Sequence, residues 1–224
     1  KGLDAIALRV KKGQLKWSTK LEDVHMNIEA ALLKYTPEEA KLQTARSRND
    51  KVVTDMRLFF KDICKDIITV LTKLQVGLLQ LAKVNQDICI PAYTHLQRAQ
   101  PISLAHQLLA YIEMFNRDHM RLKIVIDHAN VCQLGSGAVA GTTLPIDREF
   151  VAKYLDFVDT KGRPQLTQNS VDAVADRDLY IEFVTACALC GTHLSRIAED
   201  FILLGMAVII KLRDKFSLLN KEQV

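Results

Sequence analysis

The sequence contains few residues that end helices: 9 of its 224 residues are glycine and 5 are proline. Neither type occurs in residues 38–76 or 102–134, and only two glycines fall in residues 165–224. Because glycine and proline weaken or break helices, these gaps allow helices much longer than the average of roughly 11–12 residues. We therefore expect three long helices.

The sequence also has little net charge and no long apolar run. The 30 basic and 26 acidic side chains leave a formal net charge of +4, and no basic run is interleaved with aromatics, so we expect no nucleic-acid partner. The longest apolar run, Phe201–Ile210, has ten residues, whereas a membrane span needs about 20, so we expect no membrane partner. The start, Lys1–Asp4, lacks the pattern of a secretory signal, which favours a cytoplasmic location.

The cysteines are few and odd in number: Cys64, Cys89, Cys132, Cys187 and Cys190. Such a scattered set indicates free thiols in a reducing compartment. Cys187 and Cys190 form a Cys-x-x-Cys pair, which is the spacing of a redox couple or of half a zinc site. No second pair completes a ligand set, so we favour two small buried residues on an apolar helix and expect no metal.

Apolar residues recur at spacings of three and four after Asn49 and Asp50, one of which we expect to cap the first long helix. A second helix is expected to begin near Pro101, since proline suits the first helical position. A third is expected from about Val171 to Leu204, and a shorter one over Glu22–Lys34. The first apolar stripe consists of Val52, Met56, Phe59, Ile63, Ile67, Val70, Leu74, Leu78 and Leu81.

No segment shows the strict alternation of a half-buried strand. Loops gather at residues 36–50, 87–100 and 133–147, so the sequence predicts an all-α fold, an elongated bundle of long helices that forms one helical domain over residues 1–224. Apolar residues on more than one face of these helices indicate burial by partner chains. A monomer by sedimentation at micromolar concentration would contradict that hypothesis.

Two polar strings precede the long helices. In the first, Thr44–Asp50, Arg48 presents a planar fork that suits a carboxylate, and Ser47 and Asn49 add short neutral donors. The N-terminus of the following helix adds partial positive charge. The alternative interpretation is an ordinary solvated loop with a helix cap, and composition alone favours it.

The second string, Tyr93–Pro101, contains Thr94 beside His95. Histidine is the side chain best suited to proton transfer near neutral pH, although a structural histidine bonded to the backbone is the alternative. His25 lies four residues before Glu29, so the two share a helix face, either as a local pair or facing a site. The remaining histidines, His106, His119, His128 and His193, are expected to be structural.

A glycine-rich segment, Gln133–Gly141, matches neither a dinucleotide fingerprint nor a phosphate loop. Glycine permits positive φ and close backbone approach. We favour a tight turn between helices over direct ligand binding.

Together these strings resemble argininosuccinate lyase and the delta-crystallins of the fumarase/aspartase superfamily. The resemblance covers roughly residues 1–204, and residues 205–224 are expected to diverge from the family. The Arg-Ser-Arg-Asn-Asp and Tyr-Thr-His-Leu-Gln strings are together specific for this lyase. The matching segments are Glu22–His25, Thr44–Asp50, Tyr93–Pro101, Leu134–Gly141, Asp147–Arg148, Asn169–Ser170, Asp172–Ala173, Arg177–Asp178, His193–Arg196 and Glu199–Asp200.

The resemblance implies a mostly helical homotetramer whose active sites are each assembled from three subunits. It implies reversible elimination of argininosuccinate to L-arginine and fumarate, with no cofactor and no metal. Asn49 and Thr94 are implied to bind substrate with Ser47 and Arg48 nearby, and His95 to be the acid/base histidine. His25 and Gln97 are further candidates to line the site.

This sequence also departs from the family. It has no Ser-Ser, Met-Pro or Asn-Pro string, so the mobile loop that carries the family's catalytic serine is absent from these residues. Gln43 stands where the family commonly has histidine, and Ala45 where it commonly has glycine. We therefore expect little lyase activity from this polypeptide alone. The alternatives are a non-catalytic, crystallin-like structural protein on the same scaffold and a sister lyase acting on adenylosuccinate or aspartate.

Overall fold

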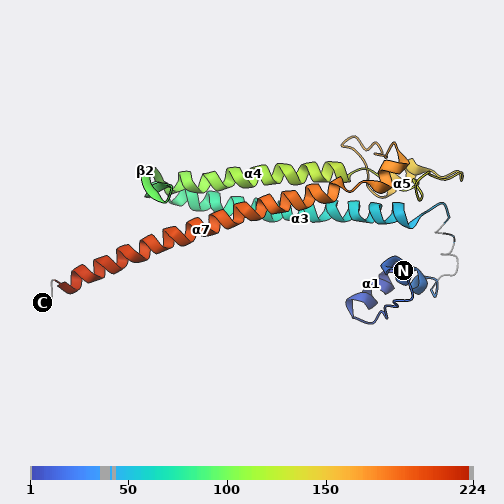
Figure 1. Ribbon diagram of the computed structural model, residues 1–224, viewed down its shortest axis with the longest axis horizontal. Helices are drawn as coiled ribbons and strands as arrows, with labels where there is room; N and C mark the ends of the chain where they lie inside the picture. Colours follow the sequence, from blue (N-terminus) through green and yellow to red (C-terminus); the bar gives the residue numbers. More distant parts are fainter. Residues whose placement is uncertain (1, 36–40, 42–43, 222–224) are drawn as a thin grey trace. The chain divides into compact units, whose positions relative to one another are not determined.

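The computed structural model describes residues 2–35, 41 and 44–221. Within them it contains seven helices and one antiparallel hairpin (Figure 1), which confirms the predicted all-α bundle of long helices. In chain order the elements are α1 (Gly2–Lys11), α2 (Val24–Leu32), α3 (Arg48–Val84), β1 (Cys89–Thr94), β2 (Gln97–Ser103), α4 (Leu104–Ala129), α5 (Arg148–Tyr154), α6 (Ser170–Ala175) and α7 (Asp178–Lys221).

The chain divides into two compact units. The first comprises Lys1–Asp55 and Cys132–Ala175, and the second comprises Met56–Val131 and Asp176–Val224. Each unit is therefore described by itself. The expectation of a single domain over residues 1–224 stays a prediction.

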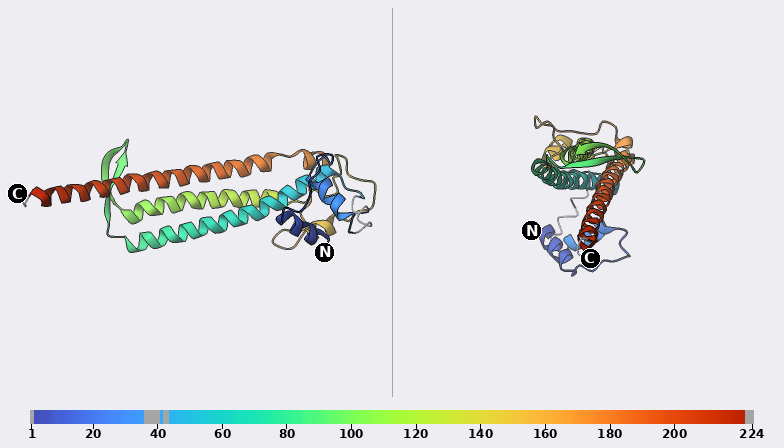
Figure 2. Two further views of the ribbon diagram at one scale, coloured as in Figure 1. Left: turned by 90° about the horizontal axis from the view of Figure 1, so that it is seen from below. Right: turned by 90° about the vertical axis from the view of Figure 1, so that its left-hand side faces the viewer.

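In the second unit, α4 and α7 lie beside the part of α3 that follows Met56 (Figure 2). The 37 residues of α3 correspond to a length of about 55 Å. The apolar stripe foreseen along this helix is only partly in the core. Leu78 is buried, whereas Met56, Ile63, Ile67 and Leu74 are partly buried against the core, and Phe59, Val70 and Leu81 are exposed. The fully or nearly fully buried core residues include Phe60, Cys64, Leu71, Leu108, Tyr111, Phe115, Leu122, Val125, Ala129 and Leu179.

The first of the long helices, α3, begins earlier in the sequence than expected. α3 starts at Arg48, and Ser47 caps it: the Ser47 Oγ accepts a hydrogen bond from the Asn49 N–H at 3.2 Å. In return the Asp50 carboxylate accepts the Ser47 N–H at 3.1 Å, which is a reciprocal capping box. The prediction of Asn49 or Asp50 as the cap is wrong, because both lie inside the first turn.

The predicted loop before α4 is instead a hairpin. β1 pairs antiparallel with β2, and Thr94 lies opposite Gln97. Pro101 lies in β2, so α4 begins at Leu104, where the Ser103 Oγ accepts the His106 N–H at 3.1 Å. The strands escaped prediction because both are mostly exposed on both faces and so carry no apolar alternation.

The predicted helix from Val171 to Leu204 is divided into α6 and α7. Asp176 lies at the break, and its Oδ1 accepts the Asp178 N–H at 2.8 Å, so it caps the longer helix. The shorter predicted helix, Glu22–Lys34, is α2, and Asp23 caps it by accepting the Met26 N–H at 2.8 Å.

The apolar surface of α3 is only partly covered within the chain. This helix is long and apolar enough to span a membrane by length and composition, a test that core helices of soluble proteins also pass. In its most apolar window only 17% of the residues are buried inside the structure. Val70, Leu79 and Val84 are exposed there.

Candidate active site

The first polar string forms the beginning of α3, where Arg48 is held by two carboxylates. Its guanidinium lies 3.1 Å from the Asp23 Oδ1 and 3.6 Å from a Glu29 carboxylate oxygen. Lys51 adds a second cation, with its Nζ 3.0 Å from Glu29. The Met26 N–H bond, aided by the charge of Arg48, lowers the pKa of Asp23 below its ordinary value. Arg48 therefore ties α2 to the start of α3.

His25 lies on α2 beside Asp55 of α3, with its Nδ1 3.5 Å from the Asp55 Oδ2. Burial raises the pKa of Asp55, against the attraction of His25 and Lys51. The predicted partner, Glu29, pairs with Arg48 and Lys51. His25 thus contacts α3 one turn after Lys51, and its role in lining a site stays a prediction.

The glycine-rich segment wraps around Asp50, which is completely buried. The Asp50 Oδ2 accepts the Gly135 N–H at 3.2 Å and the Gly137 N–H at 2.9 Å. The neighbouring Asn49 donates from its Nδ2 to the Ala138 carbonyl at 3.2 Å. Segment 133–141 is therefore a turn anchored on the first polar string. This agrees with the favoured interpretation as a tight turn.

This turn requires glycine. Gly135 and Gly137 have φ of +98° and +62°, backbone angles that residues other than glycine rarely adopt. A Cβ on Gly135 would lie 2.8 Å from the Arg148 Cγ, and one on Gly137 would lie 2.8 Å from the Gly141 carbonyl oxygen. Arg148 covers the turn and donates to the carbonyls of Leu134 and Thr167 at 3.2 and 3.1 Å.

Two further polar side chains of this turn escaped sequence reasoning. The Gln133 amide and the Ser136 hydroxyl are buried, and in the described part of the chain they have no hydrogen-bond partner. No local sequence signal marks them, because their burial depends on the turn folding over Asp50.

Ala45 is one of the departures from the family pattern, in which glycine is common at this position. Its φ is +59°, a conformation that favours glycine. The backbone at Ala45 is therefore locally strained. Gln43, the other departure, lies outside the described residues.

The second polar string forms the tip of the hairpin. His95 and Leu96 are the two turn residues between Thr94 and Gln97, with φ of +50° and +60°. These angles belong to a type I′ turn, which usually contains glycine or asparagine. Thr94, His95 and Gln97 are all exposed. Strained turns of this kind often present functional side chains.

The predicted site residues therefore fall into two groups. Ser47, Arg48, Asn49 and His25 belong to the first unit, and Thr94, His95 and Gln97 belong to the hairpin of the second. The first group surrounds the beginning of α3, and the hairpin follows its end. The helix α3 that connects them is 37 residues long.

The second unit also contains a buried polar network that the sequence did not predict. Arg57 donates to the His128 carbonyl and lies 2.6 Å from the Asp176 Oδ2, while the Lys61 Nζ donates to the Asn130 Oδ1 at 2.8 Å. The only sequence signal was the spacing of four between the two cations. They neutralise the C-terminal end of α4, where helix carbonyls carry partial negative charge.

Two histidines expected to be structural contact carboxylates between helices. The His193 Nδ1 lies 2.6 Å from the buried Asp118, and the His128 Nδ1 lies 2.7 Å from Glu182. Both pairs join α4 to α7.

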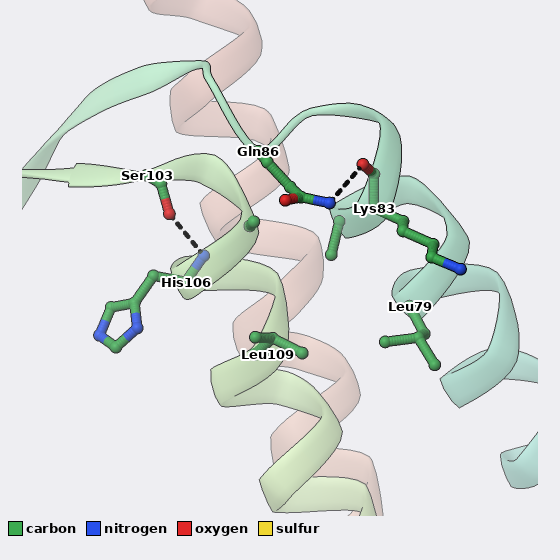
Figure 3. A pocket seen from close by; sticks show the side chains of 8 residues that line it. Leu79, Lys83, Gln86, Ser103, His106 and Leu109 are labelled. Carbon is green, nitrogen blue, oxygen red and sulfur yellow. Dashed lines mark hydrogen bonds between the residues drawn. The ribbon is translucent and has the colours of Figure 1, made fainter.

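A cavity of about 500 Å³ lies in the second unit between the end of α3 and the start of α4 (Figure 3). Lys83 gives it positive character, His106 adds a polar ring, and Leu79 and Leu109 give it apolar walls. It contains none of the predicted site residues.

The cysteines behave as small apolar residues. All five are free: Cys64, Cys132 and Cys190 are buried and Cys89 is exposed, while Cys187 is only partly buried, so the prediction of a buried Cys187–Cys190 pair holds for Cys190 alone. Burial raises the pKa of Cys64 to about 11 and also raises the pKa of Cys187 and Cys190. Raised thiol pKa values disfavour the reactive thiolate. Among the described residues, no three His, Cys, Asp or Glu side chains gather as a metal site.

Comparison with known proteins places these features in a family context. A family model described as Lyase matches residues 1–215, beyond Leu204 where the resemblance was expected to end. Argininosuccinate lyase of Albidiferax ferrireducens is 46% identical over 96% of this chain and 45% of its own length. That of a Sulfurihydrogenibium species is 47% identical over 97% of this chain and 47% of its own. The chain thus spans about half the length of the curated relatives it matches.

Solved structures agree with the fold. EDDS lyase in complex with formate is 28% identical with a TM-score of 0.77, covering 90% of this chain and 38% of that one. A fumarate lyase:delta crystallin from Brucella melitensis, at 21% identity and a TM-score of 0.67, covers 79% of this chain and 41% of that one, and it supports the fold alone.

Proposed function

This chain belongs to the lyase family, and on that premise we propose that its protein catalyses the reversible elimination of argininosuccinate to L-arginine and fumarate. The observation that carries the proposal is the identity of 46–47% with proteins named argininosuccinate lyase across almost the whole chain. The matched region takes in 96–97% of this chain.

The chemistry of the reaction suits these residue types. The proton to be removed lies next to a carboxylate and is only weakly acidic, so the carboxylate must take up charge as the proton leaves. Fixed hydrogen-bond donors stabilise such developing charge. We assign this role to Asn49 and Thr94 with Ser47 nearby. His95 serves in proton transfer, and a general acid must protonate the departing guanidino nitrogen.

Arg48 takes a less direct place in this proposal. Its guanidinium already lies 3.1 Å from Asp23 and 3.6 Å from Glu29. Its positive charge lies close to Ser47 and Asn49, where it favours an anionic ligand. His25 and Gln97 complete the candidate lining, one in each group.

The site is proposed to be shared between chains of a homotetramer. The helix that begins with the first group is about 55 Å long, and the second group follows its end. The resemblance to argininosuccinate lyase implies sites that are each assembled from three subunits, so another copy of the chain would supply the second group to the first. The exposed apolar residues of α3 and α7, among them Val70, Leu79, Ile181 and Val184, suit burial by such copies.

We place the protein in the cytoplasm as part of the same proposal. Five free cysteines suit a reducing compartment. The crystallin-like alternative has no observation in its favour, because the 46–47% identical relatives carry the names of enzymes.

The test is an assay of fumarate release from argininosuccinate, followed by ultraviolet absorbance. The product of the complete coding sequence should turn over the substrate, and the His95→Asn variant should lose turnover while its helical circular dichroism is retained. The 224-residue chain assayed alongside should show little activity. Absence of turnover by the complete, folded product would refute the proposed reaction.

A further inference from the structure

We propose that Asp50 is a positioning residue of this site: its buried carboxylate holds segment 133–141 against the start of α3 and so fixes the side-chain amide of Asn49. The inference deepens the proposed function, which makes Asn49 a substrate-binding residue.

The first step is the burial of the carboxylate. Asp50 is 0% exposed, and a buried carboxylate is costly unless it is hydrogen-bonded. It accepts three backbone N–H groups, from Ser47 at 3.1 Å, Gly135 at 3.2 Å and Gly137 at 2.9 Å. The partial positive charge of the α3 N-terminus adds to these donors. The carboxylate is thus fully engaged within the protein.

The second step is the shape of the turn. The N–H groups of Gly135 and Gly137 point at one oxygen, because both residues adopt positive φ. Such an arrangement of backbone amides forms a concave anion site. Here the anion is the protein's own Asp50, whose carboxylate oxygen accepts both N–H groups of the turn.

The third step links the turn to Asn49. The Asn49 Nδ2 donates to the carbonyl of Ala138, which follows Gly137 directly. The path from the Asp50 carboxylate through Gly137 and Ala138 to the Asn49 amide therefore closes a ring on two adjacent residues of α3. Asn49 itself is exposed, so only this ring fixes the direction of its amide. Its remaining hydrogen and its oxygen stay available to a ligand.

Removal of the charge should open the ring. In Asp50→Asn the side chain keeps one acceptor oxygen, but its NH₂ group then faces backbone N–H donors. The turn should loosen and the Asn49 amide should lose its fixed direction. The matched control is Asp62→Asn, the same change on the same helix at a side chain that is 80% exposed.

The first measurement is nuclear magnetic resonance of amide exchange, with the Asn49 side-chain signal assigned by its loss in Asn49→Ala. We expect Asp50→Asn to speed exchange at Gly137 and at the Asn49 amide about tenfold or more, because at least one hydrogen bond to a charged group is lost. Asp62→Asn should leave both rates unchanged. An unchanged exchange rate of the Asn49 side-chain amide in the folded Asp50→Asn variant would overturn the proposal. If that variant fails to fold, Gly137→Ala, which disturbs the same ring, must speed exchange of the Asn49 side-chain amide in the same way.

The second measurement is the dissociation constant for fumarate by calorimetry on the protein of the complete coding sequence. Asp50→Asn and Asn49→Ala should each weaken binding about tenfold, and the double variant should bind no more weakly than Asn49→Ala, because residues that act as one unit are not additive. Additive losses would overturn the proposal, since Asp50 would then act by another route. If the original protein binds no fumarate, the proposed function fails, while the amide exchange still decides the positioning role.

Discussion

Gln133 has a fully buried side-chain amide whose nitrogen and oxygen both lack a partner in the described part of the chain. Leaving such groups unsatisfied costs roughly 1–3 kcal/mol. Gln133→Met keeps the length of the side chain and removes both polar atoms, so we expect the free energy of unfolding to rise by about 1 kcal/mol. Thermal unfolding followed by circular dichroism measures the change. The exposed Gln168→Met in the same unit is the control and should leave the melting temperature unchanged. A lower melting temperature for Gln133→Met would show that this amide is bonded after all.

Arg57 is a buried cation that pairs with a carboxylate. Its side chain is 8% exposed and lies 2.6 Å from Asp176, and it also donates to the His128 carbonyl. Removing one partner of a buried ion pair costs about 3–5 kcal/mol, so Arg57→Leu should destabilise the protein by that amount in urea unfolding. Lys65→Leu on the same helix breaks an exposed pair with Asp62 and should cost less than about 1 kcal/mol. Equal costs for the two variants would contradict the assigned role of Arg57.

The candidate residues remain predictions, which rest on two short polar strings between apolar helices and on the family resemblance. Ser47, Asn49 and His95 stand out by composition and by resemblance alone. The burial of Asp50 was not predictable, because its Gly135 and Gly137 donors lie 85 and 87 residues away in the sequence. Long-range hydrogen bonds of this kind leave no local pattern.

The α4–α7 pair is joined by polar contacts inside an apolar interface. Tyr111 is fully buried and its hydroxyl donates to the Asp200 carboxylate, while the Gln107 Nε2 donates to the Tyr111 hydroxyl at 2.8 Å. Burial, followed by the bond to Asp200, raises the pKa of Tyr111 to about 12. The protonated phenol therefore helps to hold α4 against α7.

This pairing predicts a loss of stability at alkaline pH. An unfolded tyrosine ionises near pH 10, whereas the folded one keeps its proton up to about pH 12. The stabilisation is therefore complete below pH 10 and is lost as the pH rises through 12. In urea unfolding between pH 9 and 12, the free energy of unfolding should fall less steeply with pH for Tyr111→Phe than for the original chain. The exposed Tyr154→Phe should keep the original slope, and an equally steep loss in Tyr111→Phe would refute the assignment.

The long helices were predictable because glycine and proline are absent over long stretches and apolar residues recur at helical spacing. Their ends were less predictable, since reciprocal bonds such as the one between Ser47 and Asp50 decide which polar residue caps a helix. The hairpin was missed altogether. Its strands are exposed, and the non-glycine turn residues His95 and Leu96 give no usual turn signal.

For the assembled protein, the length of α3 is the governing fact. One group of candidate residues surrounds its beginning at Arg48, and the other follows its end at Val84. Under the proposed function, the two groups would act on one substrate when different chains supply them. The sequence indicated partner chains through its apolar helix faces, but single-chain patterns contain no information about which chain supplies which residue.

The most direct test mixes two variants of the complete protein, Asn49→Ala and His95→Asn. Each should be inactive alone, because each lacks one of the two groups in every site. After joint unfolding and refolding, the mixture should regain fumarate release from argininosuccinate, since some sites then combine an intact Asn49 from one chain with an intact His95 from another. Mixed oligomers that are verified by mass spectrometry and yet remain inactive would contradict the shared site.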